Sequence, residues 1–151
     1  MDAALISTHD GALEGDILAD MQEAVFRGGG DYAGNEFIIG SDKPALLCHY
    51  ASGRRNLDTQ DQLTLEWSDV HARYHATMIQ TLIIGNACKN YRQMHAVAHE
   101  ALEAAIMPGK PMGDVFAAHA KVFGKAGLNH ARLSACGYAM GVTFNPIWVD
   151  Y

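Results

Sequence analysis

One carboxylate stands out in this 151-residue sequence because its neighbours are apolar. Glu66 lies between Leu65 and Trp67, in a segment whose alternation predicts a β-strand. An unpaired carboxylate on such a strand is energetically costly, so its presence needs a reason. As a functional group it could act as a nucleophile, as a base or as the counter-ion of a cationic substrate. The structural alternative is an outward-facing glutamate that pairs with a neighbouring Arg or His.

Two other side chains have chemistry that could complement this carboxylate. His49 precedes a polar turn, and an imidazole can move a proton because its pKa lies near neutrality. Tyr138 lies in the run Gly-Tyr-Ala-Met-Gly (137–141), where its phenol could donate to a substrate carboxylate or oxyanion. Each has a structural alternative: a histidine bonded to a loop at a strand end, and a buried tyrosine whose hydroxyl is satisfied locally.

A third group of candidates falls on one predicted helix. His95 and His99 are four residues apart and Glu103 follows one turn later, a spacing that can bind zinc from one helix face. Arg92 falls on the same polar stripe, opposite a stripe of apolar residues. We therefore interpret this stripe as a solvated face with i,i+4 pairs rather than a metal site. Three further histidines show no such pattern: His71, His75 and His119.

These motifs resemble those of the creatinase/aminopeptidase P/methionine aminopeptidase family, peptidase family M24. In that family an Asp stands at the start of such a strand, a second Asp follows eleven residues later, and a Gly-His-x-x-Gly run comes further on. Here Glu66 takes the first place, Thr77 the second and Tyr138 that of the histidine. The Gly-Tyr-x-x-Gly variant, followed by a Pro-Ile-Trp run that ends at Trp148, resembles that of metal-independent ectoine hydrolases.

The resemblance implies an α+β protein with the pita-bread fold, in which helices cover a curved antiparallel sheet with pseudo-twofold halves. It implies a hydrolase of C–N bonds in a small cationic or zwitterionic solute, with Glu66 and His49 as catalytic residues. Tyr138 and Trp148 would bind the substrate, whereas Thr77 is expected to be structural. A threonine hydroxyl and a tyrosine are poor metal ligands, so we expect no metal cofactor.

Two other functions stay open at this point. One is a metallopeptidase resembling Xaa-Pro aminopeptidases, in which Glu66 still binds one ion. The other is a non-catalytic pseudoenzyme or binding fragment that holds a small cation or a peptide end.

Hydrophobic periodicity predicts alternating helices and strands. Helical periods cover 16–26, 90–107 and 114–123, and they end at Gly or Pro-Gly positions. Short strands are predicted at 36–39 and 45–48, and a long hairpin pairs 63–67 with 74–84.

An internal repeat is visible at a spacing of 98 residues. Gly11, Gly15 and Asp16 recur as Gly109, Gly113 and Asp114 (109 − 11, 113 − 15 and 114 − 16). We therefore expect one partial catalytic domain over 1–151, with a first half at about 1–88 and the start of a second at about 89–151. Judged by the resemblance, the domain is incomplete at both ends, and we interpret the chain as a fragment or truncated product.

Composition excludes several classes of partner. The net charge of −6 and the absence of a basic stripe argue against nucleic acid, and no apolar run approaches the roughly 18 residues of a membrane span. Three scattered cysteines fit small buried thiols in a cytoplasmic protein. Met78 and Met140 are expected to fill the core. We expect a small-molecule substrate and, for the full-length form, a homodimer.

Overall fold

The computed structural model describes residues 1–46, 53–86, 89–138 and 140–142. His49 and Trp148 therefore lie outside the described residues, as do Cys48 and Cys88. The described residues form two compact units, one comprising those of 1–86 with 140–142 and the other those of 89–138. The mixture of helices with an antiparallel sheet confirms the α+β class.

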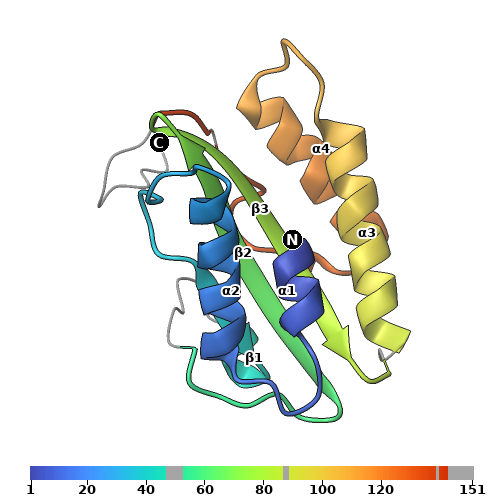
Figure 1. Ribbon diagram of the computed structural model, residues 1–151. Coiled ribbons are helices and arrows are strands. Elements are labelled where there is room, and N and C mark those ends of the chain that lie inside the picture. The colour runs from blue at the N-terminus through green and yellow to red at the C-terminus, as the bar shows by residue number, and fades with distance from the viewer. Residues whose placement is uncertain (47–52, 87–88, 139, 143–151) are drawn as a thin grey trace. The chain divides into compact units, whose positions relative to one another are not determined.

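The first unit is built on a three-stranded antiparallel sheet in the order β1-β2-β3. Its strands are β1 (Ile38–Ser41), β2 (Asp61–His71) and β3 (Tyr74–Ile84). The helices α1 (Asp2–Ser7) and α2 (Glu14–Arg27) lie over one face of this sheet (Figure 1). A tight turn joins β2 to β3, with Ala72 and Arg73 at φ values of 48° and 71°. The predicted hairpin is confirmed and is longer than its sequence pattern indicated.

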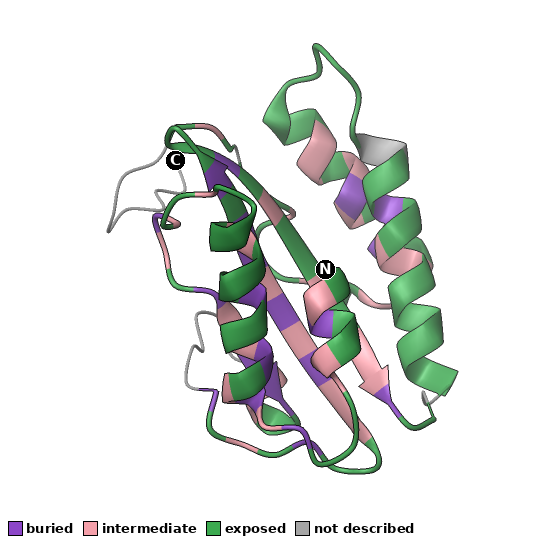
Figure 2. Cartoon of the chain, viewed as in Figure 1, coloured by how far each residue is buried: buried purple, intermediate pink, exposed green. Residues whose placement is uncertain are grey.

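The core of this unit fixes which way the strands face. Leu63, Leu65 and Trp67 alternate along β2 and are buried, with exposed fractions of 0%, 0% and 6%. They pack in one cluster with Ile17 and Met21 of α2. Figure 2 shows buried positions, in purple, at intervals along β2. Burying each such side chain contributes about 1.5–3 kcal/mol. Because side chains alternate between faces along a strand, the intervening residues of β2 point away from the helices.

The second unit contains two helices and a short 3₁₀ turn: α3 (Lys89–Ala105), α4 (Met112–Lys125) and η2 (Asn129–Ala131). Ala101 on α3 and Phe123 on α4 are buried, as is His119, whose ring lies 4.8 Å from that of Phe123. Burial, and to a smaller extent the nearby Arg132 charge, lower the pKa of His119. No helix in the described part of the chain is long and apolar enough to cross a lipid bilayer.

The helices repeat the spacing seen in the sequence. The first residue of α4 comes 98 residues after the first residue of α2, and the last residues are separated by the same number (112 − 14 and 125 − 27). The flanking glycines match as well, because Gly11 and Gly109 have φ values of 79° and 82°, and Gly29 and Gly127 have 82° and 72°. These are left-handed conformations, which glycine adopts without a steric penalty. The two units therefore share a helix of equal length with the same local geometry at both ends.

Three local predictions were wrong. A strand was predicted at 45–48, but its first two residues belong to a 3₁₀ turn, η1 (Lys43–Leu46). The turn forms because Ala45 donates its N–H to the Asp42 carbonyl and Pro44 favours a turn. Met78 and Met140 are not core residues, since each is 51% exposed. Cys136 is half-buried rather than buried.

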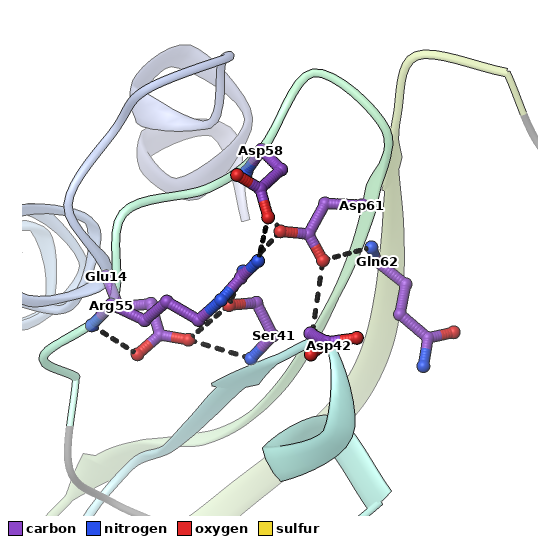
Figure 3. A network of polar contacts seen from close by, with 7 residues as sticks. All are labelled: Glu14, Ser41, Asp42, Arg55, Asp58, Asp61 and Gln62. Atoms are coloured by element: carbon purple, nitrogen blue, oxygen red, sulfur yellow. Dashed lines mark hydrogen bonds and ion pairs between the residues drawn. The ribbon is translucent and has the colours of Figure 1, made fainter.

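A buried carboxylate ties α2 to the sheet, a feature that the sequence did not reveal. Glu14 is fully buried at the start of α2 and accepts the Ser41 N–H at 2.7 Å and the Ser41 hydroxyl at 2.6 Å (Figure 3). Its second oxygen accepts the Arg55 N–H at 3.2 Å. Helix N-termini favour negative charge, so the position also suits a carboxylate electrostatically. These bonds join α2, β1 and the segment before β2.

The Arg55 side chain extends this network. Its guanidinium donates to the Ser41 hydroxyl at 2.6 Å and to the carboxylates of Asp58 and Asp61. Burial alone would raise the pKa of Asp61, but the Asp58 N–H, the Arg55 guanidinium and the Gln62 N–H together hold it below its ordinary value of 3.8. The same pairing, led by the Asp61 hydrogen bond, raises the pKa of Arg55.

We predict that Glu14→Ala lowers the free energy of unfolding by about 2–4 kcal/mol, because it leaves buried donors without an acceptor. Glu23→Ala is the matched control on the same helix. It removes only the exposed ion pair with Arg27, which is expected to contribute less than about 1 kcal/mol. Urea unfolding of both variants makes the comparison, and equal losses would contradict the structural role of Glu14.

Asp61 should make the free energy of unfolding depend on pH in the acidic range. A carboxyl whose pKa is lowered by folding stabilises the folded state above its unfolded pKa, and this contribution disappears as the pH falls below about 4. Asp61→Asn should therefore unfold more easily at pH 7 and lose less stability than the wild type between pH 5 and pH 3. Asp58→Asn, whose side chain is 72% exposed, is the control and should keep the wild-type pH dependence.

Candidate functional site

Glu66 lies on the sheet face that turns away from α1 and α2. Antiparallel pairing places Glu66 opposite Ile38 of β1 and opposite Ile79 of β3. Glu66 is half-buried, whereas Ile79 is 58% exposed. Along the described strands, Glu66 is the only Asp or Glu that the register places on this face. A half-buried carboxylate with an apolar cross-strand neighbour on either side is therefore the acidic group of this face.

A pair of hydroxyl groups lies next to it on the same face. Ser68 of β2 is directly opposite Thr77 of β3, and their side-chain oxygens are 2.6 Å apart. Thr77 is consequently diagonal to Glu66, a relation in which Cα atoms are about 7–8 Å apart and longer side chains still interact. Ser68 is buried, with 3% exposed, and Thr77 is half-buried.

The segment that contains the second motif runs along the outer edge of β3. Gly141 accepts the His75 N–H at 3.0 Å, and the Met140 sulfur accepts the Thr77 N–H at 3.2 Å. Val142 forms an antiparallel bridge with Tyr74. The structure therefore brings the end of the Gly-Tyr-Ala-Met-Gly run beside the strand that carries Thr77, although 60 or more residues separate them in sequence.

His75 holds this edge to the loop before β1. It is 7% exposed, its Nε2 accepts the Gly34 N–H at 2.8 Å, and its Nδ1 lies 2.9 Å from the Arg73 carbonyl oxygen. A nitrogen that accepts cannot carry a proton, so Nδ1 is the protonated nitrogen that donates to Arg73. No sequence pattern marks this histidine, because Gly34 and Arg73 contact it through backbone groups.

The other candidate residues belong to the second unit or lie outside the described residues. Tyr138 is the last residue of the second unit and is 36% exposed. His49 and Trp148 lie outside the described residues, so their roles stay predictions.

The histidine stripe on α3 lies on an exposed face, as predicted. His99 Nδ1 is 3.6 Å from Glu103 Oε2, with side chains 63% and 72% exposed, and His95 and Arg92 are also exposed. Across the described residues of both units, no three His, Cys, Asp or Glu side chains are grouped closely enough to hold a metal ion.

Ser68 is the site residue that sequence reasoning missed. A signal was available, because a hairpin that turns at Ala72 and Arg73 pairs Ser68 with Thr77. The predicted strand ended at Trp67, one residue too early to include it. Glu14 was missed for a different reason, since its partners come from segments 27 and 41 residues away.

The donor set on this face differs from that of a two-metal centre. Two adjacent divalent ions need several anionic oxygens, preferably carboxylates that bridge them. At the two positions that resemble the family's paired acids, the chain supplies one carboxylate and one hydroxyl that is already bonded to Ser68. Glu66 and Thr77 therefore do not fit a pair of bridging ligands.

Comparison with known proteins gives consistent results. Ectoine hydrolase of Halomonas elongata is 24% identical over 123 residues, which cover 80% of this chain and 31% of that protein. Prolidase from Pyrococcus furiosus has a TM-score of 0.87 at 16% identity, over 95% of this chain and 44% of that chain. X-Pro aminopeptidase from Thermotoga maritima has a TM-score of 0.84 at 18% identity, over 95% of this chain and 42% of that chain.

This chain thus spans less than half the length of each of these relatives. The structural likeness establishes that its described units adopt part of the pita-bread fold. The sequence profile described as metallopeptidase family M24 matches residues 1–150. A match of that extent leaves one conclusion, that the chain belongs to the M24 metallopeptidase family.

Proposed function

We propose that the polypeptide containing this chain is a metal-independent hydrolase that cleaves a C–N bond in a small cationic or zwitterionic solute. The observation that carries the proposal is the single carboxylate on the sheet face. Where two acids would bind metals, Glu66 stands beside the neutral hydroxyls of Ser68 and Thr77. A carboxylate whose cross-strand neighbours are the apolar Ile38 and Ile79 attracts an organic cation, with which it can form charge-assisted hydrogen bonds.

A cyclic amidine of the ectoine type fits this chemistry. Ectoine hydrolase of Halomonas elongata is a relative of this chain, which supports the choice of substrate class. An amidinium is planar, cationic and able to donate two hydrogen bonds to one carboxylate. Its central carbon is electrophilic, so Glu66 can deprotonate a water that attacks it, or can attack it directly, in which case a water must then displace Glu66 from the covalent intermediate. Hydrolysis adds one water across the C=N bond and then opens a C–N bond, which leaves an amide and an amine.

The remaining predicted residues would complete this reaction. His49 would transfer a proton to the departing nitrogen, since imidazole titrates near neutral pH. Tyr138 and Trp148 would hold the substrate, with the tyrosine as hydrogen-bond donor and the indole as an apolar surface for the cation.

A metal-dependent peptidase is the second candidate. The family is described as metallopeptidases, which is the observation that favours it. Such an enzyme would need additional anionic ligands beyond Glu66, and the two candidates are separated by metal content. A binding protein without catalytic activity is the third, and it would hold the cation without turnover.

Glu66→Gln is the direct test of the carboxylate. The amide keeps the shape and the hydrogen-bonding capacity but removes the charge, so turnover of ectoine should fall by on the order of 100-fold or more. The affinity for the substrate should also decrease, because the amidinium loses its charged partner. His49→Ala should lower turnover with less effect on affinity. These measurements use the longest polypeptide that contains this chain.

Asp69→Asn is the matched control, because Asp69 is an exposed acid on the same strand but on the other face. It should leave turnover unchanged. If Glu66→Gln lowers only the melting temperature and preserves turnover per folded molecule, Glu66 has no part in the mechanism.

We further predict that the purified polypeptide contains less than about 0.2 divalent metal ions per chain, since one carboxylate and a bonded hydroxyl make a weak site. Elemental analysis measures this directly, and treatment with a chelator should leave the hydrolysis rate unchanged. Two tightly bound manganese, cobalt or zinc ions per chain would favour the peptidase alternative instead.

A further inference from the structure

The hydroxyl pair beside Glu66 has no task in the mechanism proposed above. Ser68 and Thr77 face each other across β2 and β3, and their oxygens are 2.6 Å apart. Two hydroxyls contain two protons, and the bond between them uses only one. The other proton is available for a further acceptor, and which residue carries it depends on the direction of the bond.

Burial determines that direction. Ser68 is 3% exposed, and among the described residues Thr77 is the hydrogen-bond partner of its hydroxyl. If Thr77 donated to Ser68, the Ser68 proton would be buried without an acceptor, and such unsatisfied donors are strongly disfavoured. If Ser68 donates, its proton is satisfied and the free proton belongs to the half-buried Thr77. The favoured arrangement is therefore Ser68 donating to Thr77, with Thr77 donating outward.

This arrangement makes Thr77 a stronger and better oriented donor. A hydroxyl that accepts one hydrogen bond becomes more polar and donates more strongly, by roughly 10–30%. Acceptance from Ser68 also limits rotation of the Thr77 hydroxyl. The group that lies against Thr77 should therefore be an acceptor, such as a carboxylate oxygen.

We propose that Thr77, oriented by Ser68, binds an anionic oxygen of the substrate and so selects zwitterions over simple cations. Glu66 would hold the cationic group while Thr77, diagonal to it on the same face, holds the anionic one. The diagonal Cα separation of about 7–8 Å suits a solute that carries both charges on one small ring. This inference rests on the proposed function, since it needs Glu66 to bind the cation. It assigns to Thr77 a role that its sequence position did not indicate.

The experiment compares two probes that differ in one group. Ectoine carries a carboxylate on its cyclic amidine, whereas 2-methyl-1,4,5,6-tetrahydropyrimidine is the same ring without the carboxylate. The dissociation constants of both probes are measured calorimetrically for the wild type, Thr77→Val, Thr77→Ser and Ser68→Ala. Valine keeps the β-branched shape that suits the strand, and melting temperatures confirm that each variant is folded.

Thr77→Val should weaken the binding of ectoine about tenfold, as expected for the loss of one hydrogen bond to a charged group. It should leave the affinity for the tetrahydropyrimidine, which lacks the carboxylate, within about twofold of the wild type, because this probe has no group that Thr77 would bind. Thr77→Ser should restore most of the affinity for ectoine. Ser68→Ala should weaken ectoine binding by a smaller factor, about threefold, because Thr77 keeps its proton but loses its orientation.

Two results would overturn the inference while leaving the proposed function intact: unchanged ectoine affinity in Thr77→Val, or equal weakening for both probes. If the wild type binds neither probe, the proposed function itself fails and this inference fails with it. The wild-type affinities thus report on the function, and the ratio between probes reports on Thr77.

Discussion

The register of the β2–β3 hairpin is the constraint on which the rest of the first unit depends. Leu63, Leu65 and Trp67 must all reach the helices to be buried, and side chains alternate strictly along a strand. A slip of one residue would send this whole set to the opposite face, at a cost of several buried side chains. The same alternation therefore delivers Glu66 and Ser68 to the other face, so the core packing positions the candidate site.

A second set of contacts fixes the frame around this hairpin. The buried Glu14 bonds to Ser41 at the end of β1 and to Arg55 before β2. These bonds hold α2 to β1 and to the segment that leads into β2. On the other edge, His75 bonds to the backbone at Gly34 and at Gly141. The polar groups of Glu66, Ser68 and Thr77 lie between these two sets of contacts. The neutral hydroxyl pair in place of a second acid is the reason why we propose an organic ion rather than a metal ion as the ligand.

Sequence patterns predicted the elements well where a single local rule applied. Helical periodicity found α2, α3 and α4, and β-alternation found the hairpin, because burial of one face controls both patterns. The segment at 45–48 failed because Pro44 and the preceding turn overrode its apolar composition. At the site, Glu66 was found from its apolar neighbours, whereas Ser68 needs the hairpin pairing to be recognised. The Glu14 network and His75 could not be predicted, since their partners are distant in sequence and largely backbone groups.

The central claim is that Glu66, without metal ions, holds the cationic group of a small solute. It is tested most directly by a crystal structure of the chelator-treated, longest polypeptide in complex with ectoine. The account predicts an amidinium nitrogen within hydrogen-bond distance of the Glu66 carboxylate, about 2.7–2.9 Å, and no anomalous signal from a transition metal beside it. A metal ion coordinated by Glu66, or ectoine bound away from this sheet face, would contradict the account.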